Sequence, residues 1–463
     1  MRNFQEFNKW FSLIVISMSI FLCVLDLFIV NIAIPSIRNS INASTAETQF
    51  IIVFYIIGYG AFLITGSKIG NRYGHKKTFI ISMFSFMLFS FFCGSSTSAT
   101  ALNISRLFQG ISAAFMVPQG VALISNVFKV EEERVKALGI YGAIAGIASV
   151  IGQVLGGIIP DFHFSFDAWR LVFFINIPIS LLVIILANKY LKEVEIKTKE
   201  SIQIFPQMIL IILLIILMYE IVIGGEEGWK TNNILLLLFS VAGLIIFILN
   251  QKRKFKKGKE VLINMKPFLF PSFKVALLAA VTYYLVQDSY FFINANFFEE
   301  HHYLSSTTTG LLFACQGVGY VLASLLSVRF LNKYQEKFII FGLVVMILGL
   351  TGHLYVVNST TINLQAISAV LFFYGIGCGI VLPSMFTNAM RKLPFSVTSL
   401  ASGVYLTIQQ ISIGFGVSLV GRIYFNFDDG YFMATLVMIV LLLITISIFL
   451  ISDFRSKIKP SKF

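Results

Sequence analysis

Long apolar stretches separated by short polar breaks run along the whole chain of 463 residues. An α-helix needs about 20 mostly apolar residues to cross the hydrocarbon core of a bilayer. Fourteen stretches are long and apolar enough, so the pattern predicts an all-α integral membrane protein with fourteen transmembrane helices. They cover residues 9–34, 48–67, 79–95, 101–126, 136–159, 170–188, 203–223, 232–250, 272–294, 307–329, 338–357, 363–389, 398–421 and 431–451.

The continuity of these stretches excludes a membrane β-barrel, whose strands alternate apolar and polar residues over about ten positions. Residues 209–218, for example, are apolar throughout. The first stretch is too long for a cleavable signal peptide and has no small-residue cleavage site before the next helix, so we expect it to be the first span.

The composition agrees with a membrane solvent. Hydrophobic residues make up 57% of the chain and charged residues only 12%, whereas a soluble domain has about 25% charged residues. The four cysteines, Cys23, Cys93, Cys315 and Cys378, lie inside predicted spans and lack metal-ligand spacing. We interpret them as small core residues and expect no metal site.

The formal net charge of +13 would suggest nucleic-acid binding in a soluble protein, but its distribution indicates topology. With the N-terminus inside, 30 of the 35 Lys and Arg residues fall in or beside cytoplasmic segments, as the positive-inside rule requires. An even number of helices then places both termini in the cytoplasm. We therefore expect no nucleic-acid partner.

The longest predicted cytoplasmic segments flank the seventh and eighth helices. This spacing predicts an N-terminal six-helix bundle (1–188), an inserted helix pair with its loops (189–270), and a C-terminal six-helix bundle with a cytoplasmic tail (271–463). The basic run 252–259 is interpreted as an orientation signal that contacts anionic lipid. Binding of a protein partner is the alternative.

A glycine-rich cationic loop joins the second and third predicted helices. It carries Gly66, Gly70, Asn71, Arg72, Gly74, His75, Lys76 and Lys77. Glycine permits a tight turn and close helix approach, and basic side chains can bind the carbonyl ends of neighbouring helices. The segment, called here the 66–77 loop, resembles the hallmark loop of the major facilitator superfamily, in which Asp stands at the place of Asn71 and usually Arg at that of His75.

Three further motifs narrow this resemblance. Residues 25–35, with Asp26, are similar to the first-helix signature of drug:proton antiporters, and residues 102–114, with Arg106, to their fourth-helix motif. Residues 169–178 resemble the sixth-helix signature of the fourteen-helix branch. The resemblance implies a major facilitator fold of 6 + 2 + 6 helices and multidrug efflux.

The fifth predicted helix carries glycines at small-xxx-small spacing, which allows close helix packing and pivoting. Gly152, Gly156 and Gly157 belong to this set. The segment resembles the family's antiporter motif, with Gln153 in place of a proline. A static helix contact is the alternative interpretation.

Ionisable residues inside spans are costly and therefore indicate function. We assign proton coupling to Asp26, Arg106 and Asp288. The alternatives are an Asp26 satisfied by backbone donors or Asn31 and an Arg106 that binds carbonyl groups. Glu220 lies near a predicted helix end, so we interpret it as interfacial.

Asp288 lies among aromatic side chains, and an acid beside aromatic faces suits a lipophilic cation. We therefore predict a substrate site on the C-terminal side, although these polar groups would equally suit hydrogen bonds between helices. It comprises Asp288, Tyr284, Gln287, Tyr290, Asn294, Gln316, Tyr405 and Gln409.

These features predict a proton-coupled exporter of amphipathic cationic or zwitterionic compounds, including antibiotics and dyes, that works by alternating access in a bacterial cytoplasmic membrane. No phosphate-binding Gly-x-x-x-x-Gly-Lys-Ser/Thr loop occurs, which argues against ATP as the energy source. We expect no enzyme activity, no cofactor and a monomer that binds lipid, protons and small molecules. A narrow exporter of a metabolite, lipid precursor or peptide is the alternative, followed by a non-transporting membrane sensor or intramembrane enzyme.

Overall fold

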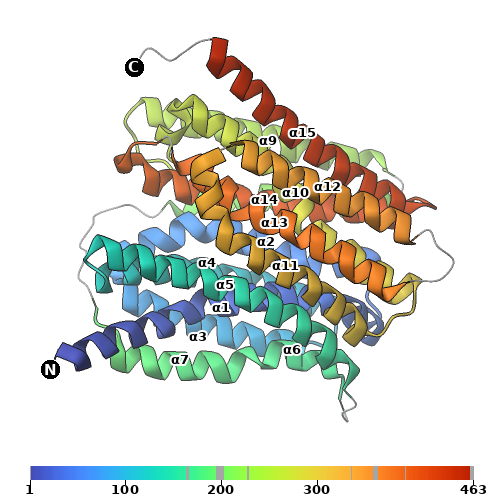
Figure 1. The fold of residues 1–463 in the computed structure, drawn as a ribbon, viewed down its shortest axis with the longest axis horizontal. Helices are drawn as coiled ribbons and strands as arrows, with labels where there is room; N and C mark the ends of the chain where they lie inside the picture. The colour runs from blue at the N-terminus through green and yellow to red at the C-terminus, as the bar shows by residue number, and fades with distance from the viewer. Residues whose placement is uncertain are drawn as a thin grey trace. The chain divides into compact units, whose positions relative to one another are not determined.

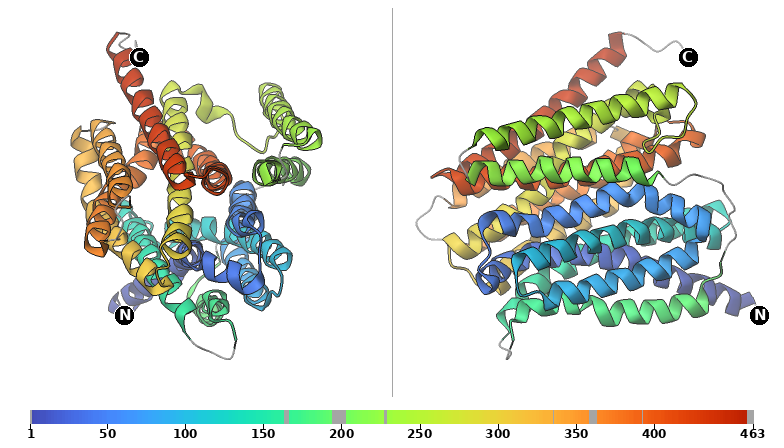
Figure 2. Two further views of the ribbon diagram at one scale, coloured as in Figure 1. Left: turned by 90° about the vertical axis from the view of Figure 1, so that its right-hand side faces the viewer. Right: turned by 180° about the vertical axis from the view of Figure 1, so that it is seen from behind.

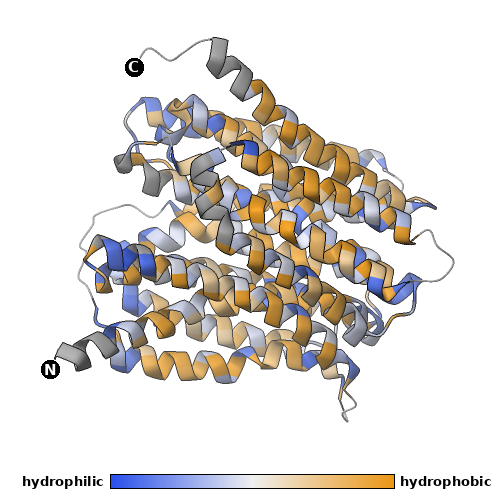
Figure 3. Ribbon diagram, viewed as in Figure 1, coloured by the Kyte–Doolittle hydropathy of each residue, from blue (hydrophilic) through white to orange (hydrophobic). Residues whose placement is uncertain are grey.

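The computed structural model describes residues 2–162, 166–193, 203–226, 229–334, 336–357, 363–391 and 393–458, which are helical apart from short turns (Figure 1). Within these ranges fourteen helical segments are long and apolar enough to span a membrane. Each overlaps one predicted stretch, so the predicted helical membrane architecture is confirmed. Figure 3 shows the corresponding pattern, with apolar residues along the helices and polar residues concentrated near their ends.

The described chain forms two compact units. Unit 1 comprises Met1–Ile263 with Ser305–Thr307, and unit 2 comprises Asn264–Leu304 with Thr308–Phe463. The helices up to the division are α1 (Arg2–Ile41), α2 (Thr45–Tyr73), α3 (His75–Ser95), α4 (Ala99–Val127), α5 (Glu131–Ile158), η1 (Ile159–Asp161), η2 (Ala168–Arg170), α6 (Leu171–Phe174), α7 (Asn176–Tyr190), α8 (Ile204–Glu226) and α9 (Thr231–Lys256). After it come η3 (Lys266–Leu269), α10 (Pro271–Asn296), the π-helical turn η4 (Phe297–His301), α11 (Ser306–Tyr334), α12 (Glu336–Val357), α13 (Leu364–Arg391), α14 (Phe395–Asn426) and α15 (Gly430–Ile458).

Several helices continue beyond the apolar stretch that predicts them. Helix α1 passes through Pro35 and ends at Ile41, and the helix predicted to begin at residue 79 begins at His75. Hydrophobicity marks only the part of a helix in hydrocarbon, whereas the backbone hydrogen bonds continue into the interface until a turn interrupts them. The loop predicted between the sixth and seventh spans falls partly on residues 194–202, outside the described residues.

Close backbone contacts at glycine hold the helices of unit 1 together. A Cβ atom on Gly110 of α4 would lie 2.0 Å from the carbonyl oxygen of Tyr55 on α2, and one on Gly66 of α2 would lie 2.2 Å from that of Ala114 on α4. Membrane helices pack by such close approach because lipid provides no hydrophobic force between them. Helices α2 and α4 are therefore held in one register.

Helices α8 and α9 belong to unit 1 and lie side by side (Figure 2). Helix α8 contacts α2 through Gln207, which donates to the carbonyl oxygen of Ala61 and accepts a 2.8 Å hydrogen bond from Thr65. Near the other end of α8 the rings of Phe50 and Tyr219 stack with centroids 5.4 Å apart. The pair is thus bonded to the N-terminal helices.

Unit 2 uses the same packing rule. A Cβ atom on Gly375 of α13 would lie 2.0 Å from the carbonyl oxygen of Gln316 on α11, and one on Gly416 of α14 would lie 2.2 Å from that of Leu285 on α10. The second contact lies one helical turn from Asp288. It brings α14 directly against the part of α10 that carries this acid.

Candidate functional site

A buried ion pair joins the first and fourth helices of unit 1. The Nη1 atom of Arg106 on α4 lies 2.5 Å from Oδ2 of Asp26 on α1, and both side chains are fully buried. The sequence analysis assigned both residues to proton coupling, and the structure brings them into direct contact. The pair lies in the hydrophobic interior, where an unpaired charge is most costly.

Amide side chains complete the surroundings of Asp26. Its Oδ1 atom accepts hydrogen bonds from Gln109 of α4 at 2.8 Å and from Asn176 of α7 at 2.9 Å. Gln109 also donates to Ser90 of α3 at 2.8 Å and accepts from Arg106 at 2.7 Å. One carboxylate therefore connects α1, α4 and α7, and Gln109 extends the connection to α3.

Arg106 is fixed from a further side by α2. Its Nε atom donates to the carbonyl oxygen of Ile51 at 3.0 Å, and its guanidinium carbon lies 4.1 Å from the ring centroid of Tyr55. An arginine over an aromatic face gains a cation–π interaction that strengthens when water is absent. The planar guanidinium is thereby held in one orientation.

Gln109 and Asn176 are site residues that the sequence reasoning did not assign. Gln109 lies inside the motif at 102–114, and Asn176 lies inside the motif at 169–178. The sequence could have indicated both residues, because an amide within an apolar span requires a hydrogen-bonding partner just as a charge does.

Contacts with α4 hold the 66–77 loop in place within unit 1. Gly66 and Gly70 lie against α4, and a Cβ atom on Gly70 would lie 1.8 Å from Oε1 of Gln119. That same oxygen lies 2.8 Å from Nδ1 of His75, while Nε2 of Gln119 donates to the carbonyl oxygen of Gly66 at 2.8 Å. The buried Gln119 thus bonds both sides of the turn.

The charged part of the loop contacts the end of α7. Gly74 adopts a positive φ of 102°, a conformation that glycine adopts without a Cβ penalty. The carboxylate of Glu193 accepts hydrogen bonds from the backbone nitrogens of Lys76 at 3.1 Å and Lys77 at 2.9 Å. The Lys76 ammonium donates to the carbonyl oxygen of Asn188 at 2.9 Å.

Of the other predicted motif residues, Arg72 lies with its guanidinium carbon 5.4 Å from the ring centroid of Tyr73, and Asn71 lies within α2.

Glycines of the fifth span lie against the backbone of α1. Cβ atoms on Gly152 and Gly156 would lie 2.9 Å and 2.5 Å from the carbonyl oxygens of Leu25 and Ile29, and Gly157 is also buried. Gln153 is 2% exposed, and its Oε1 atom has no hydrogen-bond partner within the described chain. Helix α5 therefore packs against the turn of α1 that carries Asp26.

Asp288 differs from Asp26 in its surroundings. The Asp288 side chain is fully buried in α10, yet neither carboxylate oxygen has a hydrogen-bond partner among the residues that the structure describes. No described basic side chain forms an ion pair with it. The carboxylate of Asp26 in unit 1 thus has hydrogen-bond partners on both oxygens, whereas that of Asp288 in unit 2 has none among the described residues.

Aromatic side chains lie on the same face of α10 as Asp288. Tyr284 is one helical turn before it, at the i,i+4 spacing that places two side chains side by side. The hydroxyl of Tyr405 on α14 lies 3.3 Å from that of Tyr284, with their rings edge to face. Of the predicted glutamines, Gln287 and Gln316 have Oε1 atoms that are buried without a partner in the described chain, and Gln409 is half-buried on α14.

Tyr290 and Asn294 belong to a separate network. The hydroxyl of Tyr290 lies 3.0 Å from Nε2 of His353 on α12, and Tyr431 of α15 donates to Asn294 at 2.9 Å and lies 3.5 Å from Nδ1 of His353. Tyr290 also stacks on Tyr374 with ring centroids 4.0 Å apart. These contacts join both predicted residues to α12, α13 and α15. His353 was missed, although it lies inside the predicted span 338–357.

Three bacterial proteins are similar in sequence to this chain over most of its length. The chain is 27% identical to the probable actinorhodin transporter of Streptomyces coelicolor, covering 90% of this chain and 73% of that protein. It is 26% identical to the riboflavin transporter RibZ of Clostridioides difficile, covering 89% and 87%. It is 25% identical to the multidrug resistance protein Stp of Mycobacterium tuberculosis, covering 89% and 75%.

A solved structure and a family model give results that agree with these three relatives. A bacterial homologue of the human lysosomal transporter Spinster, solved in an inward-facing and unoccupied conformation, superposes with a TM-score of 0.68 at 14% identity over 96% of each chain. The sequence model of the Major Facilitator Superfamily matches residues 16–417 and 276–463. The chain therefore belongs to the Major Facilitator Superfamily and is a multi-pass membrane transporter rather than an enzyme.

Proposed function

We propose that this transporter is a proton-coupled exporter of amphipathic organic compounds that carry a positive charge, acting as an antiporter. The observation that carries the proposal is the carboxyl group of Asp288, fully buried and without a partner in the described chain. An isolated carboxylate in a low-dielectric interior is costly. A proton or a cation at this carboxylate would remove that cost.

Competition for one carboxylate provides the coupling. A proton and a cationic substrate neutralise the same charge, so each lowers the affinity for the other. A carrier that moves across the membrane with either occupant, but not with the bare carboxylate, exchanges one for the other. Exchange of one inward proton for one outward monovalent cation moves no net charge, so the proton concentration gradient across the membrane drives export.

The side chains around Asp288 support an organic cation rather than a metal ion. Tyr284 and Tyr405 provide aromatic surface on α10 and α14, and aromatic faces attract organic cations. The unpaired Oε1 atoms of Gln287 and Gln316 add hydrogen-bond acceptors in the same unit. Soft, apolar walls with few polar groups are typical of sites for small organic ligands.

We assign a different role to Asp26 and Arg106. Because each contacts several helices of unit 1, the pair fixes the bundle against which transport occurs. We further infer a location in a bacterial cytoplasmic membrane with both termini inside, no cofactor, and a monomer as the working unit.

Titration of purified protein tests the proposal. Addition of a lipophilic cationic dye to the protein in weakly buffered detergent solution should release protons, and the affinity for the dye should rise with pH as competition from protons falls. Asp288→Asn should reduce proton release at least tenfold and make the remaining affinity independent of pH.

Asp428→Asn is the matched control, since this acid is exposed at the end of α14 and should leave proton release unchanged. Dye binding by wild-type protein without proton release would contradict the antiport mechanism. Proton release by Asp288→Asn equal to that of wild type would contradict the assignment of Asp288.

A narrow metabolite exporter is the second candidate, favoured by the relative named as a riboflavin transporter. Such a protein would release protons with one compound of a chemically varied panel, whereas the preferred function predicts release with several unrelated cations. The panel should include riboflavin, dyes and cationic antibiotics.

A further inference from the structure

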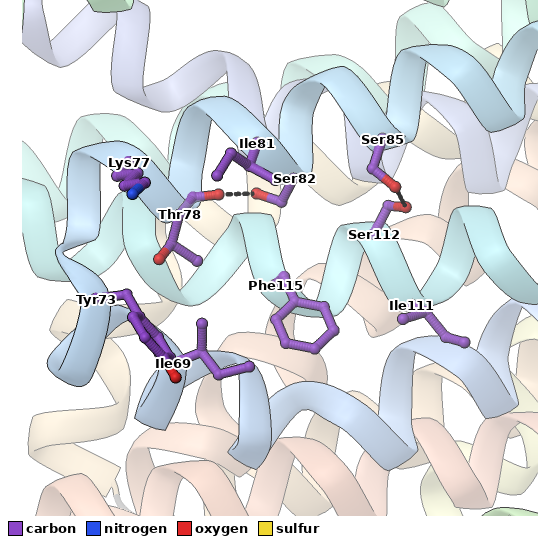
Figure 4. Close-up of a pocket in the computed structure, with 10 residues that line it drawn as sticks. All are labelled: Ile69, Tyr73, Lys77, Thr78, Ile81, Ser82, Ser85, Ile111, Ser112 and Phe115. Atoms are coloured by element: carbon purple, nitrogen blue, oxygen red, sulfur yellow. Dashed lines mark hydrogen bonds between the residues drawn. The ribbon is translucent and has the colours of Figure 1, made fainter. Parts of the chain in front are cut away.

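A groove of about 430 Å³ lies on unit 1 between α2, α3 and α4 (Figure 4). Its apolar lining includes Ile69, Ile81, Ile111 and Phe115. Ile81 is 58% exposed and lies within a helix that spans the membrane. The groove is therefore open toward lipid.

The serine side chains that line the groove have their hydroxyl donors occupied. Ser82 donates to the carbonyl oxygen of Thr78 at 2.7 Å, Ser112 donates to that of Phe108 at 2.8 Å, and the hydroxyls of Ser85 and Ser112 lie 2.8 Å apart (Figure 4). A hydroxyl bonded to its own helix presents little polarity to a neighbour. This wall is suited to a hydrocarbon chain.

One end of the groove is polar. Lys77 is exposed there, and no carboxylate of the described chain forms an ion pair with its ammonium group. Glu193 accepts hydrogen bonds from the backbone of Lys76 and Lys77. Tyr73, 56% exposed, lines the same end. A free cation and a phenol at the polar end of an apolar groove match the phosphate of a lipid headgroup.

The length of the groove agrees with one lipid chain. From Lys77 to Ser85 the helix rises about 12 Å at 1.5 Å per residue, and one leaflet of a bilayer is about 15 Å deep, half of the hydrocarbon core. Basic pockets between transmembrane helices at the cytoplasmic side recognise anionic lipid headgroups.

From these observations we infer a binding site for one anionic phospholipid, with its phosphate at Lys77 and one acyl chain in the groove between α3 and α4. The inference is independent of the substrate and of proton coupling. The lipid lies beside the 66–77 loop, because Ile69 and Tyr73 line the groove from that loop. Such a lipid would stabilise the packing of α2 and α3 at their basic ends.

Lipid retention in native mass spectrometry tests the site. Protein purified from bilayers of equal phosphatidylglycerol and phosphatidylcholine should retain one phosphatidylglycerol in preference to phosphatidylcholine. Lys77→Gln should lower this preference about fivefold, the factor that corresponds to about 1 kcal/mol for each basic residue near an anionic surface. Ser85→Phe, which fills the groove, should remove the bound lipid.

Lys252→Gln is the matched control, because Lys252 is an exposed lysine of α9 that does not line the groove, and it should retain lipid as wild type does. Equal retention of the two lipids, or equal effects of Lys77→Gln and Lys252→Gln, would overturn the site. Displacement of the lipid by a transported dye in a competitive manner would also overturn it, since the groove would then bind substrate. Lys77→Gln changes only an exposed side chain, so it decides the question even if Ser85→Phe does not fold.

Discussion

Two buried aspartates in this chain occupy opposite chemical environments. Asp26 contacts Arg106, Gln109 and Asn176, whereas Asp288 has no partner in the described chain. Removing the charge of Asp26 therefore breaks contacts among three helices, and removing that of Asp288 breaks no hydrogen bond of the described chain. The two substitutions should have separate consequences, one for stability and one for transport.

Asp26→Asn should destabilise the protein by about 3 kcal/mol, because it leaves the Arg106 guanidinium buried without its counter-ion. The matched control is Asp167→Asn. Asp167 forms a 3.3 Å ion pair with Arg170 but is 48% exposed, and exposed pairs contribute at most about 1 kcal/mol. Unfolding of the purified variants in mixed detergent micelles measures both. Equal loss of stability in the two variants would contradict the structural role of Asp26.

At the scale of the helices, glycine contacts determine which pairs lie closest together. The sequence pattern of α5 does not distinguish its glycines from one another, but the structure does. Gly156 lies against the backbone of α1, while a Cβ atom on Gly142 would meet nothing within 4 Å. Spacing alone therefore does not show which glycines of this helix lie at a close backbone contact.

Gly156→Ala should destabilise unit 1 by about 1 to 3 kcal/mol, the usual cost of inserting an atom into a packed contact. Gly142→Ala should be neutral or stabilising by up to about 1 kcal/mol, because alanine favours the helix more than glycine does. Thermal unfolding of both variants in the same detergent measures the difference. A tolerated Gly156→Ala would show that α1 and α5 are not held in this close register.

Hydrophobic pattern was sufficient to predict the spans and their type, because the energy of lipid burial acts on each helix separately. Partners between helices could not be predicted in the same way. Asp26 and Arg106 are 80 residues apart, and their contact depends on how α1 and α4 pack. The sequence also could not distinguish the partners of Tyr284 and Tyr290, because both are tyrosines within the same apolar span. In the structure Tyr284 contacts Tyr405, whereas Tyr290 contacts His353.

At the scale of the whole molecule, the distribution of basic residues predicts orientation. Lys257, beyond the end of α9, and Asp428, beyond the end of α14, are both exposed and are predicted to lie on opposite sides of the membrane. With the four native cysteines replaced by alanine, a membrane-impermeant maleimide should label Asp428→Cys in intact cells. It should label Lys257→Cys only after permeabilisation. The reverse pattern would contradict the predicted orientation.

Transport by everted membrane vesicles tests the central claim most directly. Vesicles that contain the wild-type protein should accumulate a lipophilic cationic dye when their interior is made acidic, and a proton ionophore should abolish the accumulation. Asp288→Asn should reduce the rate at least tenfold, while Asp428→Asn should not change it. Dye accumulation that is insensitive to the ionophore, or an Asp288→Asn rate equal to that of wild type, would contradict proton-coupled export through this carboxyl group.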